Sequence, residues 1–161
     1  MLPLNLVPCC RECNTAKLNL IRENGAPLYL HLYLDRLSDV DPFLVADVTV
    51  QSGVPEIEYR VEPTPAVPAH VASRLKTHFT KLDLAKYYQR RAIEEAGIQV
   101  QYVAEELADG ASPSDLQDDL RRQAGYVAAI RGVNHWRSAA LVGFANSHQF
   151  TSGACTGWLP Q

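Results

Sequence analysis

Three of the four cysteines in this chain lie within five positions near its start, at Cys9, Cys10 and Cys13. The spacing Cys10-x-x-Cys13 is typical of one half of a structural zinc site, which binds four ligands in a tetrahedron. Cys155 is a single distant thiol, so the sequence offers no second pair. Two buried thiols or a redox pair are the alternatives, although no strand–helix context favours a thioredoxin-like site. Clustered thiols fit metal binding in a reducing compartment better than a secreted disulfide framework, and we expect a cytoplasmic protein.

The string around these cysteines, from Asn5 to Lys17, reads Asn-Leu-Val-Pro-Cys-Cys-Arg-Glu-Cys-Asn-Thr-Ala-Lys. It resembles the second half of the HNH nuclease motif, in which a ββα unit holds one divalent metal ion. The resemblance implies that Asn14 is a ligand of Mg²⁺ or another divalent ion. It also implies that Cys10 and Cys13 are the second pair of a structural Zn²⁺ knuckle. Asn5 would support catalysis by bracing the hairpin loop that positions the catalytic histidine.

Two basic residues of the same string are candidate DNA contacts. Lys17 is expected one helical turn beyond Asn14, on the same face of a helix, where its ammonium group can meet a phosphate. Arg11 is the second candidate. The resemblance makes DNA the expected partner and phosphodiester hydrolysis the expected activity. A role in phage defence is inferred only from the roles that members of the family usually have.

The catalytic histidine itself is missing from the matched segment. In the family this general base and the first cysteine pair lie upstream, whereas only Met1 to Leu4 precede Asn5 here. Hydrolysis needs an activated water and a metal ion that absorbs charge, and a lone carboxamide holds Mg²⁺ poorly. We therefore expect the chain as written to be inactive. A start placed too far downstream and a remnant or dead paralogue are both open explanations; a histidine strand donated by a partner is disfavoured, because the unit is normally one continuous segment.

The remaining histidines give no clear replacement for that base. His31 lies after the metal-binding helix, whereas the family places its base before it, so we interpret it as structural. His78 is expected at the boundary of a helix core, and no role is assigned to His70, His135 or His148. Six basic residues between positions 74 and 91 fit a solvated helix face better than a DNA contact, because acids are interspersed among them.

Composition restricts where any DNA contact can lie. The chain has 161 residues and a formal net charge of −3, from 15 Lys and Arg against 18 Asp and Glu. A protein whose whole surface grips nucleic acid is usually basic, so a DNA contact here has to come from a local patch. No apolar stretch is long enough to cross a membrane, and residues 1–8 make a poor signal peptide because they lack a basic start.

Periodicity and turn residues predict the elements. Trp136 and Phe144, eight residues apart on one helix face, are expected in the core. Gly97 is a candidate kink, Ser112 and Asn134 are expected helix caps, and Gly132 a helix stop. The expected elements are a helix over 14–24, a strand or buried extended segment over 28–34, a hairpin of strands 43–50 and 56–62 through Ser52-Gly53, helices over 68–80, 82–108, 112–132 and from 134, and an aperiodic tail from 147.

These elements predict an α+β fold. Residues 1–25 form the truncated ββα-metal segment, and residues 26–161 form a C-terminal α+β domain with a small antiparallel sheet and three to four helices, mostly helical after residue 67. The region 28–150 also resembles, more diffusely, the C-terminal part of bacterial HNH proteins, notably at His78–Leu84 and Asn134–Trp136. The alternative function is a non-catalytic adaptor that docks a partner protein through residues 26–161.

Overall fold

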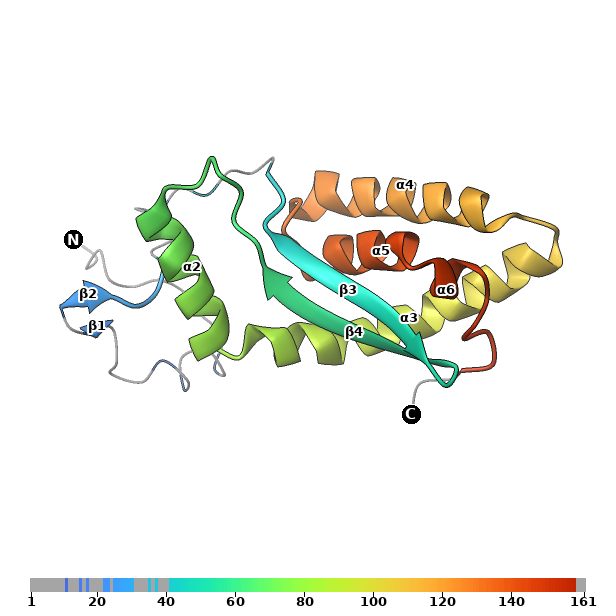
Figure 1. Cartoon of the computed structure of the whole chain (residues 1–161), viewed down its shortest axis with the longest axis horizontal. Helices are drawn as coiled ribbons and strands as arrows, with labels where there is room; N and C mark the ends of the chain where they lie inside the picture. Colours follow the sequence, from blue (N-terminus) through green and yellow to red (C-terminus); the bar gives the residue numbers. More distant parts are fainter. Residues whose placement is uncertain are drawn as a thin grey trace. The chain divides into compact units, whose positions relative to one another are not determined.

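The chain forms two compact units (Figure 1). The first comprises residues 1–38 and 63–84, and the second comprises residues 39–62 and 85–161. The computed structural model describes residues 41–158 without a gap. Before position 41 it describes Arg11, Thr15, Lys17, 22–23, 25–30, Asp35 and Leu37.

The first unit begins with helical backbone and then a very short hairpin. Arg11, Thr15 and Lys17 have α-helical backbone. β1 (Arg22–Glu23) pairs antiparallel with β2 (Ala26–Pro27), and Gly25 lies at the turn with φ +80°. The prediction of a helix reaching residue 24 was therefore wrong at its end. The signal was Asn24-Gly25, because an Asn-Gly pair favours a two-residue hairpin turn with positive φ.

Helix α2 (Ala69–Lys81) completes the first unit. Its buried residues are Val71, Leu75 and Phe79, which confirms the predicted helix and its apolar face. Asp83, with φ +50°, separates α2 from the next helix, which begins two residues later than predicted. Within the segment predicted as extended, the described residues 28–30 form no strand, although Leu28 is buried.

The second unit is built on one hairpin of β3 (Leu44–Gln51) and β4 (Val54–Val61), as predicted within two residues. The register pairs Leu44 with Val61 and Val48 with Ile57. Ser52 and Gly53 both have positive φ, so the two-residue loop has the twist that tight hairpins prefer. Alternate residues of both strands are buried and the others face solvent.

Helices complete this unit: α3 (Leu84–Ala108), α4 (Pro113–Arg131), α5 (Trp136–Asn146) and α6 (His148–Thr151). The start of α4 is as predicted. The Ser112 side chain accepts a hydrogen bond from the Asp115 backbone N–H, and the Asp115 carboxylate accepts one from the Ser112 N–H, which forms a capping box. Gly132 ends α4 with φ +93°. α3 continues through Gly97, and the kink expected at this residue stays a prediction.

Helix α5 is central to the core of the second unit. It packs against β3 on one side and α4 on the other (Figure 1). Gly143 permits this close packing, because a Cβ there would lie 2.5 Å from the carbonyl oxygen of Ala46. Phe144 and Phe150 stack with ring centroids 4.5 Å apart, so the segment predicted as an aperiodic tail contributes α6 and a core residue.

Asn134 has a different role from the predicted helix cap. The N-cap of α5 is His135, whose side chain accepts from the Arg137 N–H. The Asn134 side-chain oxygen accepts hydrogen bonds from the backbone N–H groups of Phe43 at 2.7 Å and Leu44 at 3.0 Å. Its Nδ2 donates to the carbonyl oxygen of Asp41 at 3.1 Å. Asn134 thus joins the α4–α5 turn to the first residues of β3.

The architecture is mixed α and β, as predicted at that level. After residue 67, the described part of the chain holds five helices instead of three to four, because α6 was not predicted. None of the helices found in the described residues is long and apolar enough to span a bilayer.

Candidate functional site

Most residues of the HNH-like string lie outside the described residues. This applies to Asn5, Cys10, Cys13 and Asn14, and also to His31. Arg11 is described and exposed. Among the residues that the structure describes, no group of three or more His, Cys, Asp and Glu side chains is arranged to hold a metal ion.

Lys17, the candidate phosphate contact, lies against an aromatic ring in the first unit. Its Nζ is 5.8 Å from the centroid of the Tyr29 ring, within the range of a cation–π contact. The side chain is half-buried. The Tyr29 ring in turn meets the His78 ring edge-on, with centroids 5.8 Å apart and planes at 82°. These two contacts bring Lys17 to the segment that leads to His31.

His78 binds the backbone of Leu30 in this unit. Its Nδ1 accepts a hydrogen bond from the backbone N–H of Leu30 at 3.3 Å, so the neutral ring carries its proton on Nε2. Burial lowers the pKa of His78, and the nearby Lys17 charge lowers it further. The half-buried position agrees with the boundary role expected from the sequence.

Arg74, one of the six basic residues between 74 and 91, also has an ion-pair partner within this unit. It forms an ion pair with Asp35, and the two side chains are only 20% and 9% exposed. Arg74 and His78 lie four residues apart on α2, and they bind Asp35 and Leu30, respectively. Arg74 therefore belongs to the unit's interior and is no part of a solvated face.

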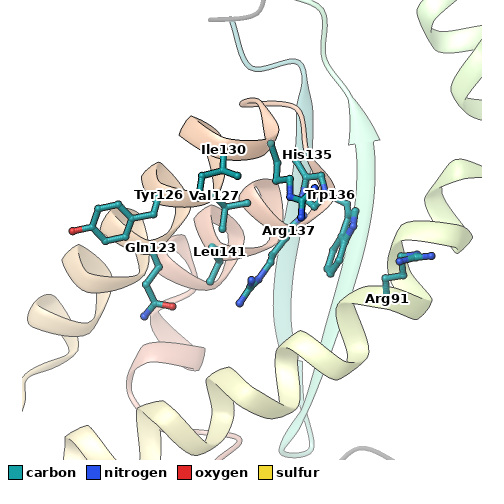
Figure 2. Close-up of a pocket in the computed structure, with 10 residues that line it drawn as sticks. Arg91, Gln123, Tyr126, Val127, Ile130, His135, Trp136, Arg137 and Leu141 are labelled. Atoms are coloured by element: carbon teal, nitrogen blue, oxygen red, sulfur yellow. The ribbon is translucent and has the colours of Figure 1, made fainter.

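The second unit contains a cleft of about 730 Å³ between α3, α4 and the start of α5 (Figure 2). Figure 2 shows Arg91 on α3 at one end and Tyr126 on α4 at the other, with Trp136 and Arg137 between them. The lining residues are Arg91, Gln123, Tyr126, Val127, Ile130, Arg131, His135, Trp136, Arg137 and Leu141.

The lining is cationic and aromatic and includes no carboxylate. Arg91 and Arg131 are exposed, and within the described part of the chain neither has a carboxylate oxygen within 4.0 Å. The Arg91 guanidinium lies 4.9 Å from the Tyr87 ring centroid, which fixes its position on α3. Two large side chains at the cleft, Tyr126 and Ile130, are 64% and 78% exposed.

One buried acid lies beneath this lining. The Glu95 side chain is 5% exposed, and its carboxylate is 2.7 Å from Nε of Arg137. Gln99 donates a second hydrogen bond to Glu95 at 3.0 Å and one to Gln123 at 3.2 Å. The Glu95 charge also contributes, after burial, to raising the pKa of Tyr59. Glu95 thus connects Gln99 of α3 with Arg137 of α5.

The arginines of the cleft affect the pKa of His135. Burial lowers its pKa, and then the charges of Arg131, Arg137 and Arg91 lower it further. Arginines from three helices thus act on one imidazole. Its Nδ1 accepts a hydrogen bond from the Arg137 N–H at 3.3 Å, and its ring lies 5.4 Å from the Trp136 ring.

Sequence reasoning missed this cleft. Trp136 was predicted as core, but it is half-buried and lines the cavity, while Phe144 is fully buried as predicted. The available signal was the run from Arg131 to Arg137, in which two arginines, a histidine and a tryptophan fall within seven positions. Basic and aromatic residues mixed in this way are typical of surfaces that bind nucleic acid.

Comparison of the chain with protein-family models, with curated proteins and with solved structures found no match. The chemistry of the site therefore has to follow from its own residues. In the cleft, guanidinium donors can bind an anion and aromatic faces can stack on a planar group. The described residues that line the cleft include no serine or cysteine that could act as a nucleophile.

Proposed function

We propose that this chain is part of an HNH-type, metal-dependent endonuclease that acts on DNA. The observation that carries the proposal is the string from Asn5 to Lys17, in which the asparagines, the cysteine pair and the lysine follow one another at the spacing of the motif. The helical backbone at Thr15 and Lys17 supports the placement of Lys17 one turn after Asn14.

The metal ligands in this stretch fit the motif by type. Thiolates such as Cys10 and Cys13 suit zinc, and the carboxamide oxygen of Asn14 suits a hard divalent cation in company with stronger ligands. When bound, that cation would neutralise charge on the scissile phosphate and activate a water. Lys17 and Arg11 would hold flanking phosphates. In the motif, the general base and the remaining ligands belong to a preceding strand, so residues 1–161 alone are inactive in this proposal.

The charge distribution of the second unit gives independent support for a nucleic-acid substrate. The chain is acidic overall, with a net charge of −3, yet three arginines meet in one cleft whose lining has no carboxylate. A local cationic patch on an acidic protein is what an anionic polymer requires for a defined point of contact.

Nicking of supercoiled plasmid in Mg²⁺ or Mn²⁺ tests the proposal. The 161-residue protein is compared with the product of the longest open frame that contains it, each as wild type, Asn14→Ala and the control Asn146→Ala. We expect no nicking by the 161-residue protein. A longer product with the histidine strand should nick, and Asn14→Ala should abolish the activity while Asn146→Ala, an exposed residue of α5, preserves it.

Two results would contradict the nuclease proposal. Nicking that survives Asn14→Ala would mean that the motif does not supply the metal ligand. An in-frame stop close before Met1, together with no nicking, would replace the nuclease by the non-catalytic binding protein that docks a partner through residues 26–161.

A further inference from the structure

The cleft of the second unit combines two features that are unfavourable in an empty surface. Three like charges, those of Arg91, Arg131 and Arg137, line it, and its lining residues include no carboxylate to offset them. The buried Glu95 pairs with Arg137. Beside these charges, Tyr126 and Ile130 leave large apolar surfaces in water. A ligand that offsets both features must carry negative charge and a flat apolar group.

We propose that this cleft binds single-stranded nucleic acid, with phosphates on the guanidinium groups of Arg91 and Arg131 and bases on the rings of Tyr126 and Trp136. Guanidinium groups pair with phosphate through two parallel N–H donors, and Arg91 is already held in place by Tyr87. Base stacking on an aromatic ring tolerates any sequence, because every base has a π face.

Single strands fit better than a duplex for a geometric reason. In a duplex the base faces are stacked on one another, so only phosphates and groove edges meet a protein, and the exposed Tyr126 ring would find no partner. The cleft volume of about 730 Å³ lies in the range of sites that enclose a ligand the size of a nucleotide. The rest of the strand would continue over the surface.

An acidic protein segment is the rival occupant, because carboxylates also pair with arginine. The observations favour nucleic acid, since a peptide of acidic residues offers no flat group for Trp136, Tyr126 and the His135 ring.

This inference stands without the nuclease proposal, because none of its residues belongs to the HNH-like string. Its test contains no divalent metal, so failure of binding at the cleft and failure of cleavage are separate results. The protein used is the whole 161-residue chain.

The first experiment measures fluorescence anisotropy of a labelled oligothymidylate of about 12 nucleotides, in EDTA, at several salt concentrations. Arg91→Gln/Arg131→Gln is compared with Arg90→Gln/Arg121→Gln. The control pair lies on the same two helices, is also exposed and removes the same formal charge, but does not line the cleft; Arg121 pairs with Asp118. We expect Arg91→Gln/Arg131→Gln to weaken binding at least ~10-fold. The magnitude of the slope of log K against log salt concentration should fall by about 1.4, and the control variant should change little in either quantity. Equal losses in both pairs would overturn the proposal, because they would reflect net charge alone.

The second experiment tests stacking and the choice of ligand. Tyr126→Ala should weaken binding by roughly 5- to 100-fold, whereas Tyr126→Phe should bind like wild type, since the ring is the group that stacks. A duplex of the same length and an oligoglutamate peptide serve as competitors. Duplex binding as tight as the single strand, with no effect of Tyr126→Ala, would overturn the single-strand assignment. Preferential competition by oligoglutamate would overturn nucleic acid as the ligand and replace it by an acidic protein segment.

Discussion

At the scale of single residues, the Asn134 side chain makes hydrogen bonds to backbone groups that backbone partners make elsewhere in a strand. The Asn134 carboxamide accepts hydrogen bonds from the N–H groups of Phe43, just before β3, and of Leu44, its first residue. Because the same group donates to Asp41, three hydrogen bonds depend on one residue.

We expect Asn134→Ala to lower the free energy of unfolding by about 2–4 kcal/mol, because it leaves partly buried donors without an acceptor. The measurement is urea denaturation followed by circular dichroism. Asn146→Ala, an exposed change on α5, should alter stability by less than about 0.5 kcal/mol and serves as the control. If the two variants were equally stable, the Asn134 hydrogen bonds would contribute nothing to the fold.

The Glu95–Arg137 pair predicts an asymmetry between its two partners. Glu95 is 5% exposed, whereas the Arg137 side chain is 43% exposed. Removing Arg137 leaves a buried carboxylate without its cation, while removing the Glu95 charge leaves a guanidinium that can turn to water. We expect Arg137→Gln to cost about 2–3 kcal/mol and Glu95→Gln less than about 1.5 kcal/mol, measured by urea denaturation. The reverse order would mean that the pair does not hold Arg137 as described.

At the scale of elements, glycine marks where α5 approaches β3. Gly143→Ala would place a Cβ 2.5 Å from the Ala46 carbonyl oxygen and 2.9 Å from a Val48 methyl group. The helix or the strand must then move. We expect a loss of at least about 2 kcal/mol. Gly125→Ala on α4 meets nothing within 4 Å, and should stabilise the protein by up to about 1 kcal/mol. Thermal unfolding of the two variants checks the opposite signs.

Local patterns predicted the elements whose ends are defined by nearby residues. The hairpin of β3 and β4 follows from alternation and from Ser52-Gly53, and the start of α4 follows from Ser112 and Asp115. The start of α5 was misplaced because two adjacent residues, Asn134 and His135, could each cap a helix. The long-range bond of Asn134 to residues 41–44 decides between them, and no local pattern contains that bond.

The cleft was harder to predict for a related reason. Its residues come from three helices, and only the run from 131 to 137 is continuous. The arginine at position 91 belongs to a basic run that is expected to be solvated, and its exposed position agrees with that expectation. What makes it part of a site is the cavity that Arg91 of α3 and Arg137 of α5 line together.

At the scale of the whole molecule, charge is distributed unevenly. The net charge is −3, but the groups that face His135 are Arg91 of α3, Arg131 of α4 and Arg137 of α5, with Glu95 buried beneath Arg137. In the free protein these arginines and burial hold the pKa of His135 below its usual value. A bound phosphate would offset the positive field and raise that pKa.

Binding and protonation are reciprocal, so a ligand that raises the pKa of His135 must bind more tightly as the pH falls. In the free protein the pKa of His135 lies below its ordinary value, and in the complex the ring takes up its proton at a higher pH than in the free protein. We therefore expect affinity for the oligothymidylate to rise as the pH falls from the pKa of His135 in the complex towards its lowered pKa in the free protein. His135→Asn, which keeps a capping side chain, should remove this part of the pH dependence. The His135 Cε1–H signal, titrated by NMR with and without the oligonucleotide, measures the shift directly. A pKa that falls on binding would mean that the ligand shields His135 from water without bringing a phosphate near it, and the arginines would then have to be neutralised elsewhere.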